Sequence, residues 1–321
     1  MSFGLVEARS PGKLIILGEH AVVSGAPALS LALKRYTYAL LEPQLKAPEV
    51  SITSSFVSKA SWGPYSLNQP ELPSYFLWAK KMIELSFPEA FDQGMNWSLR
   101  SEILPGHGMG SSAAAICASF WAMQALFQRK KDKKEIWPFL TSIESICHGK
   151  SSGIDVATSL QGGFIRFQQG EYVSLDAPDI SGWYFLDCGR PLQSTKECVL
   201  HSQQIFAKDS GLLKEMWHAA EIFIQRLFHA SFEEISRGIK HWHTLQKRLG
   251  VVPQAIGDLI DHIERAGASA KVCGAGALSG EGAGLVLVLA PLGIAQELKR
   301  DGLKLHPVEV DHEGSYITLL G

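Results

Sequence analysis

The fold of this chain is decided by one stretch, Pro105-Gly106-His107-Gly108-Met109-Gly110-Ser111-Ser112-Ala113-Ala114-Ala115-Ile116. Its glycines permit backbone conformations that side chains would block, and good helix formers then continue from Ala113 to Phe127. A glycine loop that enters a helix presents unpaired N–H groups and the positive end of the helix dipole, which suits phosphate. Residues 105–112 therefore predict a phosphate-binding loop. The alternative is a flexible hinge before a core helix, and the Gly-Lys-Ser/Thr of a Walker loop is missing.

The composition is that of a globular protein with a near-neutral surface. The 321 residues are 46% hydrophobic and 19% charged, with 30 Lys and Arg against 32 Asp and Glu. This length favours two domains, which we expect at 1–180 and 181–321. The net charge of −2 does not favour nucleic acid or an anionic membrane as a partner. The first nine residues lack a signal-peptide pattern, and the five cysteines lack paired spacing, so we expect a cytoplasmic protein with reduced thiols.

In the first half, the pattern predicts strands before the glycine loop and helices after it. Pro and Gly residues predict a loop over 59–73, and Ser74 is expected to cap a helix that ends at Phe87. Lys134 to Cys147 predicts a further helix. Short apolar or alternating runs predict strands at Leu14–Leu17, Lys34–Leu41, Val50–Thr53, Trp97–Ile103 and Phe164–Phe167.

In the second half, a strand at Trp183–Cys188 is followed by long helical patterns. A glycine-rich segment, residues 274–284, then lies between two apolar runs that read as strands. Its Gly-x-Gly-x-x-x-Gly spacing and the strand after it exclude a Rossmann dinucleotide site. It either closes over substrate or nucleotide phosphate, or is a plain hairpin. The helices are expected at roughly 196–208, 212–229, 231–249 and 253–266.

Two constellations of charged residues bear on chemistry. Lys13 and the pair Glu19-His20 flank the Leu14–Leu17 run, and a lysine beside a transferring phosphoryl group neutralises its charge. Glu144 lies late in a helix, where it and Ser112 could share a Mg²⁺. Asp155 follows a turn and could take a proton from an attacking hydroxyl. Each residue also has a plain structural interpretation. Lys13 could be solvated, Glu19-His20 could be a capping or packing pair, and Glu144 and Asp155 could be surface charges or turn caps.

Together these segments resemble the GHMP kinase family. Pro11-Gly12-Lys13-Leu14-Ile15-Ile16-Leu17-Gly18-Glu19-His20-Ala21-Val22-Val23 resembles the first family motif, in wording typical of the mevalonate kinase branch. Pro105-x-x-x-Met109-Gly110-Ser111-Ser112-Ala113-Ala114 resembles the second. Lys271-Val272-Cys273-Gly274-Ala275-Gly276 resembles the start of the third, and Ser152-Gly153-Ile154-Asp155 also fits. The resemblance covers nearly the whole chain.

The resemblance implies an α+β fold in two domains, the first like ribosomal S5 domain 2 and the second ferredoxin-like, with the active site between them. It implies phosphorylation of mevalonate by ATP with Mg²⁺, while the oligomeric state stays open between monomer and homodimer. By residue it implies Asp155 and Lys13 as catalytic groups and Ser112 and Glu144 as Mg²⁺ ligands. The implied ATP-binding residues are Pro105, Gly106, His107, Gly108, Met109, Gly110, Ser111 and Ser112, and the implied substrate-binding residues are Glu19, His20, Gly274, Ala275 and Gly276.

Three positions depart from the family pattern. The third motif continues as Ala277-Leu278-Ser279-Gly280-Glu281-Gly282 instead of a run of glycines. Lys150-Ser151 replaces the family's Asn-Pro, and His107 is an unusual residue for the loop, where it either contacts phosphate or points to solvent. The alternatives are therefore another GHMP kinase, acting on phosphomevalonate or a sugar, and a nucleotide-binding homologue without catalysis.

Overall fold

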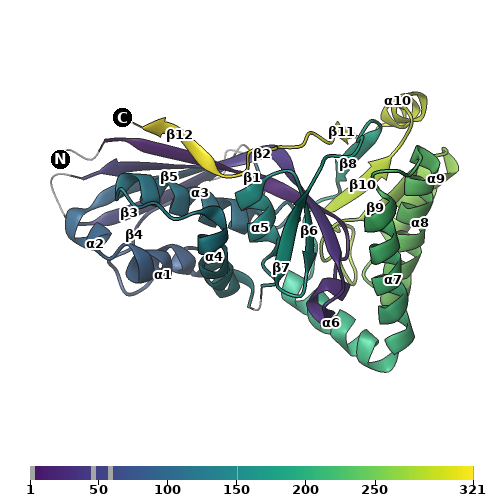
Figure 1. The fold of residues 1–321 in the computed structure, drawn as a ribbon, viewed down its shortest axis with the longest axis horizontal. Helices are drawn as coiled ribbons and strands as arrows, with labels where there is room; N and C mark the ends of the chain where they lie inside the picture. The colour runs from purple at the N-terminus through teal and green to yellow at the C-terminus, as the bar shows by residue number, and fades with distance from the viewer. Residues whose placement is uncertain (1–3, 45–47, 57–60, 150, 321) are drawn as a thin grey trace.

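The computed structural model describes residues 4–44, 48–56, 61–149 and 151–320, and places most of the described strands in one large sheet. The strands of this first sheet are β1 (Val6–Leu17), β2 (Ala28–Pro43), β3 (Val50–Phe56), β4 (Ser61–Ser66), β5 (Met95–Ser101), β6 (Phe164–Gln168), β7 (Glu171–Leu175) and β12 (Tyr316–Leu320). They run in the order β12-β1-β2-β5-β3-β4, with β6 paired to β2 and β7 paired to β6. The last strand of the chain therefore returns to pair with the first (Figure 1).

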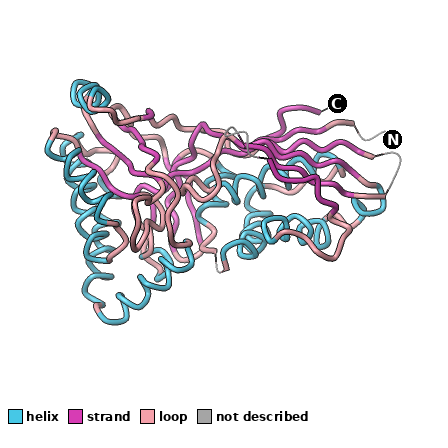
Figure 2. The backbone as a smooth tube through the Cα atoms, turned by 180° about the vertical axis from the view of Figure 1, so that it is seen from behind, coloured by secondary structure: helices cyan, strands magenta, loops and turns pink. Residues whose placement is uncertain are grey.

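Helices cover one face of this sheet, as Figures 1 and 2 show from opposite sides. The burial of β1 changes along its length, because its outer part is covered on one face and its inner part on both. From Val6 to Arg9 buried and partly exposed residues alternate, and from Ser10 to Leu17 every residue is buried. Alternation indicates one covered face and continuous burial indicates two. The covering helices are α1 (Leu77–Ser86), α2 (Glu89–Gln93), α3 (Ser111–Leu126), α4 (Lys133–His148) and α5 (Ile154–Gln161).

The second face of that inner end is covered by the rest of the chain, which builds its own sheet. Its strands are β8 (Trp183–Asp187), β9 (Ser269–Val272), β10 (Leu285–Leu289) and β11 (His306–Pro307), in the antiparallel order β11-β8-β10-β9. Its helices are α6 (Thr195–Lys208), α7 (Ser210–Arg226), α8 (Phe232–Leu249), α9 (Gln254–Arg265) and α10 (Leu292–Arg300). The succession strand, helices, two strands, helix, strand is ferredoxin-like, so the α+β prediction is confirmed.

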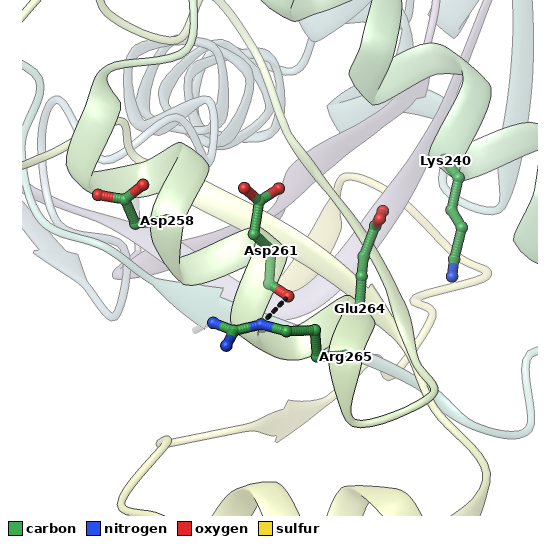
Figure 3. Close-up of a pocket in the computed structure, with 5 residues that line it drawn as sticks. All are labelled: Lys240, Asp258, Asp261, Glu264 and Arg265. Carbon is green, nitrogen blue, oxygen red and sulfur yellow. Dashed lines mark hydrogen bonds between the residues drawn. The ribbon is translucent and has the colours of Figure 1, made fainter.

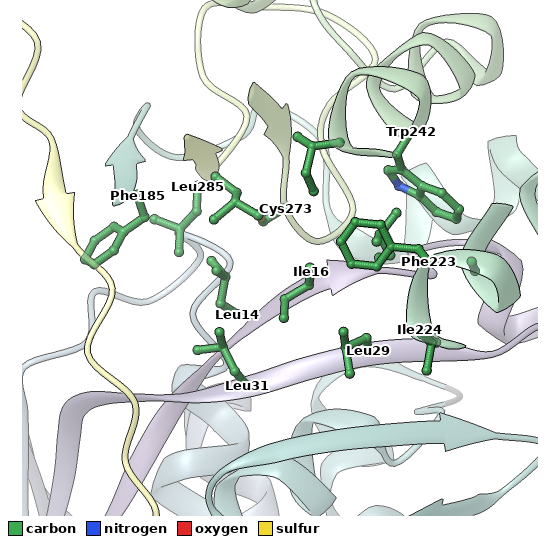
Figure 4. Packing of buried hydrophobic residues seen from close by; sticks show 14 of the residues in the cluster. Leu14, Ile16, Leu29, Leu31, Phe185, Phe223, Ile224, Trp242, Cys273 and Leu285 are labelled. Atoms are coloured by element: carbon green, nitrogen blue, oxygen red, sulfur yellow. The ribbon is translucent and has the colours of Figure 1, made fainter. Parts of the chain in front are cut away.

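One hydrophobic core joins the two sheets. Leu14 and Leu31 of the first sheet belong to the same buried cluster as Phe185 and Leu285 of the second, together with Trp242 of α8 (Figure 4). A shared apolar core of this kind holds the two halves in a fixed relation. The boundary near residue 180 stays a prediction, and β12 crosses it by returning to the first sheet.

Two local predictions are wrong. Residues 61–66, expected within a loop, form strand β4, which pairs with β3 at the edge of the sheet. An edge strand tolerates Pro64, because a missing N–H on the open side breaks no ladder hydrogen bond. Ser74 does not cap α1: it begins a 3-10 turn, and α1 starts at Leu77 after Phe76, with no side-chain cap.

The position of Lys13 relative to the first strand also differs from the prediction, which placed Lys13 before that strand. Strand β1 begins at Val6 and contains it. The pairing of β1 with β2 shifts register between Pro11 and Gly12, one residue before Lys13. Such an irregularity changes the direction in which the next side chains point and is frequent beside active sites.

Candidate active site

The glycine loop runs from β5 into α3 and lies directly against Lys13. The Lys13 N–H donates to the Met109 carbonyl at 2.9 Å. Gly110 has φ 71°, and a Cβ there would lie 2.8 Å from Lys13 Cγ, so the position excludes a side chain for two reasons. Gly110 precedes α3, and no side chain caps this described helix end. The first-turn N–H groups at Ser111 and Ser112 are thus placed for an anionic ligand.

The structure brings Lys13 and Asp155 together beside this loop. Lys13 Nζ lies 3.2 Å from Asp155 Oδ2, and the two side chains are 5% and 26% exposed. Asp155 stands in the first turn of α5, directly after Gly153 and Ile154, so it follows a turn as the sequence predicts. The carboxylate therefore lies at the positive end of the α5 dipole. One side of this ion pair therefore remains open to a reactant.

Glu144 is a buried carboxylate beside the pair. Its side chain lies in α4 and is 2% exposed, and the Ser151 hydroxyl donates to Oε2 at 2.6 Å. Burial, with the charge of Asp155 as the next cause, raises the pKa of Glu144 to about 8. A buried carboxylate in such surroundings gains strongly from a nearby cation.

The next question is whether the Glu144 carboxylate and the Ser112 hydroxyl have the chemistry of Mg²⁺ ligands. Helix α4 packs against α3, which begins at Ser111-Ser112. Mg²⁺ typically takes one or two protein oxygens, and phosphates and water complete its shell. Among the described residues there is no cluster of three or more His, Cys, Asp or Glu that could hold a metal by itself. Ser112 and Glu144 carry one hydroxyl and one carboxylate, which are oxygen ligands of the kind that Mg²⁺ prefers.

Glu19 is sealed inside the molecule. One carboxylate oxygen pairs with Lys271 Nζ of β9, and the other accepts a hydrogen bond from Trp242 Nε1 at 2.9 Å. The lysine also donates to the carbonyls of Ile15 and Ile16, at 3.3 and 2.8 Å. Glu19 therefore ties β1 to β9 and α8, and direct contact with a substrate requires this pair to open.

His20 is buried next to the third glycine segment. Its backbone has φ 64°, in the left-handed region, and Nδ1 lies 2.7 Å from the Ser202 hydroxyl. Burial lowers the pKa of His20 to about 4. A hydrogen bond with the backbone of Ala275 is the largest effect in the opposite direction. The ring is neutral near pH 7, and its Nε2 has no hydrogen-bond partner within the described residues. The ring is 5% exposed, so a ligand reaches this nitrogen only if neighbouring residues move.

Comparison with known proteins agrees with this geometry. Residues 75–163 match the family model described as the GHMP kinases N terminal domain. A mevalonate kinase of Pyrococcus abyssi is 30% identical over 308 residues, which cover 89% of this chain and 89% of that protein. The chain belongs to the GHMP kinase family.

Solved structures of other GHMP kinases share its fold. The Methanococcus jannaschii mevalonate kinase superimposes with a TM-score of 0.77 at 21% identity, over 97% of this chain and 99% of that one. Lactococcus lactis galactokinase, in complex with galactose, gives a TM-score of 0.74 at 13% identity, over 97% and 95%. Because kinases with different acceptors give similar scores, the fold alone does not select the acceptor.

The third glycine segment of this GHMP kinase connects β9 to β10 and packs against two other loops. The Ala277 N–H donates to the Val251 carbonyl at 3.1 Å, and a Cβ at Gly276 would lie 2.2 Å from that oxygen. A Cβ at Gly284 would lie 3.0 Å from the His107 carbonyl, in the phosphate loop. The strand that follows agrees with the exclusion of a Rossmann site, and the segment is a hairpin connection that contacts the phosphate loop.

The sequence does not reveal three partners of two site residues. Lys271 and Trp242 hold Glu19, and Asp187 holds His107. Of these three, only Lys271 belongs to a motif. Asp187 ends β8 and holds His107, so of the two alternatives for His107 the one in which it points to solvent is wrong. The position of Asp187 at the end of a strand, shortly before Gly189, is the feature of the sequence that could have indicated a functional role. Lys150, which replaces a family residue, lies outside the described residues.

A separate surface depression lies on α8 and α9 (Figure 3). Its described lining residues are Lys240, Asp258, Asp261, Glu264 and Arg265. The Arg265 Nε–H donates to the Asp261 carbonyl within its own helix at 3.2 Å. These residues belong to the outer helix surface and not to the site around Lys13.

No described helix combines the length and apolar character that crossing a membrane requires.

Proposed function

We propose that this GHMP kinase transfers the γ-phosphoryl group of MgATP to the 5-hydroxyl of mevalonate. The observation that carries the proposal is the Lys13–Asp155 pair, 3.2 Å apart, beside a glycine loop that enters a helix. The acceptor is supported by relatives such as the Pyrococcus abyssi protein, which is named mevalonate kinase.

The nucleotide phosphates bind at the loop in this proposal. Residues 105–112 offer backbone N–H groups, and the N-terminus of α3 adds its dipole. Lys13 places a cation beside the loop, because its own N–H is bonded to the Met109 carbonyl. Fixed donors and charges of this kind act without rearrangement during the reaction.

The chemistry follows from the open side of the ion pair. The acceptor oxygen forms a bond to the γ-phosphorus as the bond from that phosphorus to ADP breaks, and the hydroxyl proton passes to the Asp155 carboxylate. Lys13 Nζ neutralises the charge on the transferring group and holds the carboxylate in place. In a largely dissociative transfer, positioning contributes more than the strength of the base.

Ser112 and Glu144 would hold Mg²⁺, which neutralises phosphate charge when it is bound. Mg²⁺ near Glu144 favours its ionised form and opposes the effect of burial on its pKa. On the acceptor side, the neutral ring of His20 lies next to the backbone of Ala275, so Gly274, Ala275 and Gly276 are grouped with it. We assign these four residues to acceptor binding.

The test is ADP release from MgATP with mevalonate, 5-phosphomevalonate, homoserine and galactose as acceptors. We expect turnover with mevalonate and background hydrolysis with the other three. Turnover with another acceptor would support the kinase chemistry but would assign a different substrate. ATP binding without turnover on any acceptor would favour the non-catalytic homologue. A cytoplasmic location and a homodimer are further parts of the proposal, tested by fractionation and by sedimentation.

A further inference from the structure

His107 connects the phosphate loop to the second sheet. Its Nδ1 lies 2.8 and 3.0 Å from the two carboxylate oxygens of Asp187, the last residue of β8. The His107 and Asp187 side chains are 18% and 27% exposed, so the contact is largely shielded from water. Asp187 is itself held, because Oδ1 accepts a hydrogen bond from the Gly189 N–H at 2.9 Å.

Close backbone packing surrounds this contact. A Cβ at Gly106 would lie 3.1 Å from Arg190 Nε, and one at Gly282 would lie 2.5 Å from the Arg190 carbonyl. A Cβ at Gly284 would meet the His107 carbonyl at 3.0 Å. The phosphate loop, residues 187–192 and the third glycine segment therefore touch one another, and the second sheet supports the loop from one side.

The loop needs such support because of its composition. Gly106, Gly108 and Gly110 all have positive φ, of 81°, 85° and 71°. Glycines lose more conformational freedom on ordering than any other residue, so a free loop of this kind is costly to fix around a ligand. The two side chains between them act as anchors: Met109 is buried in the core shared by the two sheets, and His107 bonds to Asp187.

We infer that His107 is a positioning residue, which fixes the phosphate loop in its nucleotide-binding conformation through Asp187 and not through contact with phosphate. The inference rests on the proposed binding of ATP at this loop, and it is independent of the acceptor. Without this anchor the loop is ordered only when the ligand binds. The free-energy cost of that ordering then weakens binding. We expect the dissociation constant of MgATP to rise about tenfold, or about 1.4 kcal/mol.

The experiment measures binding of a non-hydrolysable Mg–ATP analogue by calorimetry to His107→Ala, Asp187→Ala and the double variant. Because the two residues act through one contact, each single variant should lose about the same affinity, and the double variant no more than either. If His107 touched phosphate, Asp187→Ala would leave affinity unchanged or improve it, since a nearby negative charge is removed. That result would overturn the inference, as would unchanged affinity in His107→Ala.

Two further variants separate positioning from general damage. Asn places its amide near the position of Nδ1, whereas Gln places it near Nε2, so His107→Asn should recover most of the affinity and His107→Gln little. Equal affinities of these two variants would contradict the inference. His218→Ala, at an exposed histidine of α7, is the matched control and should bind like the wild type.

Steady-state kinetics and the wild type complete the test. In His107→Ala the KM for ATP should rise by a larger factor than kcat falls, which a loss of folded protein would not produce. A wild type that binds no Mg–ATP analogue would overturn the proposed function together with this inference. Wild-type binding with unchanged variants would overturn the inference alone.

Discussion

Two lysine–carboxylate pairs involve the same end of the first sheet, and they differ in exposure. Lys13 and Asp155 are 5% and 26% exposed, and the pair stands beside the phosphate loop. Lys271 and Glu19 are 0% and 2% exposed, and they join β9 to the residues after β1. The same two kinds of charge are thus used once where reactants can reach them and once where they cannot.

The additional hydrogen bonds explain why the buried pair is tolerated. Lys271 reaches two backbone carbonyls, and Glu19 accepts from Trp242, so the desolvated charges have several partners. Without such partners the desolvation of two charges exceeds their attraction. The Lys13–Asp155 pair keeps an open side instead, and we assign the chemistry to it. Solvent access, and not the presence of an ion pair, therefore separates the reactive pair from the structural one.

The largest expected effect is on turnover when the open pair is broken. Asp155→Asn removes the proton acceptor while keeping the shape of the side chain, so kcat should fall by about 10²–10⁴. Binding of a Mg–ATP analogue should change little. Because the Lys13 side chain is only 5% exposed and loses its carboxylate partner, stability should fall, so the rate is compared at a temperature where the variant is fully folded. Stopped-assay ADP measurements check the rate. Turnover near the wild-type value would remove Asp155 from the reaction.

The next effect is on stability when the closed pair is broken. Lys271→Met leaves the Glu19 carboxylate buried without a cation and should lower the free energy of unfolding by about 3–5 kcal/mol. Urea unfolding followed by tryptophan fluorescence measures it. Adding Glu19→Gln should recover part of the loss. The matched control is Lys247→Met, whose half-exposed pair with Asp261 spans 3.8 Å and should contribute less than about 1 kcal/mol.

A smaller effect concerns the pH dependence of stability at Glu144. Burial raises the pKa of its folded form from 4.5 to about 8, so between these values the folded protein holds a proton that the unfolded chain has released. Stability therefore falls as pH rises through this window, and stays lowered above it. Glu144→Gln removes the penalty, so its melting temperature without Mg²⁺ should exceed that of the wild type by several degrees at pH 8 and by little at pH 5. Equal differences at both pH values would contradict the assignment.

The smallest effect concerns one hydrogen bond of the closed pair. Trp242→Phe keeps most of the ring packing and removes the Nε1–H that donates to Glu19 at 2.9 Å. We expect a loss of about 1–2 kcal/mol in unfolding free energy, with kcat within about twofold of the wild type. A large fall in kcat with little loss of stability would show that the closed pair takes part in the chemistry.

The parts of this molecule that could be predicted from sequence are those with local signals. The glycine loop and helix α3 are contiguous in the chain, and the apolar runs marked most of the strands. Family motifs brought Lys13 and Asp155 to notice, and the structure places them in contact. Strand β4 was missed because Gly63 and Pro64 read as a loop, although an edge strand accepts them.

The contacts that sequence did not reveal join distant segments. Lys271 and Glu19 are 252 residues apart, and His107 and Asp187 are 80 apart, with no periodicity that links them. Only the arrangement of the second sheet on the first brings them together. The sequence pattern identified which residues carry charge, but tertiary packing decides whether that charge faces a ligand or another side chain.

The reaction product shows most directly whether the open pair promotes transfer of the γ-phosphoryl group from MgATP to mevalonate. Wild-type protein is incubated with MgATP and R-mevalonate and followed by phosphorus NMR. We expect a phosphomonoester on the 5-carbon of mevalonate, formed in equal amount with ADP, and none with Asp155→Asn over the same time. Free inorganic phosphate as the only new product, or the same ester formed at an undiminished rate by the variant, would contradict it.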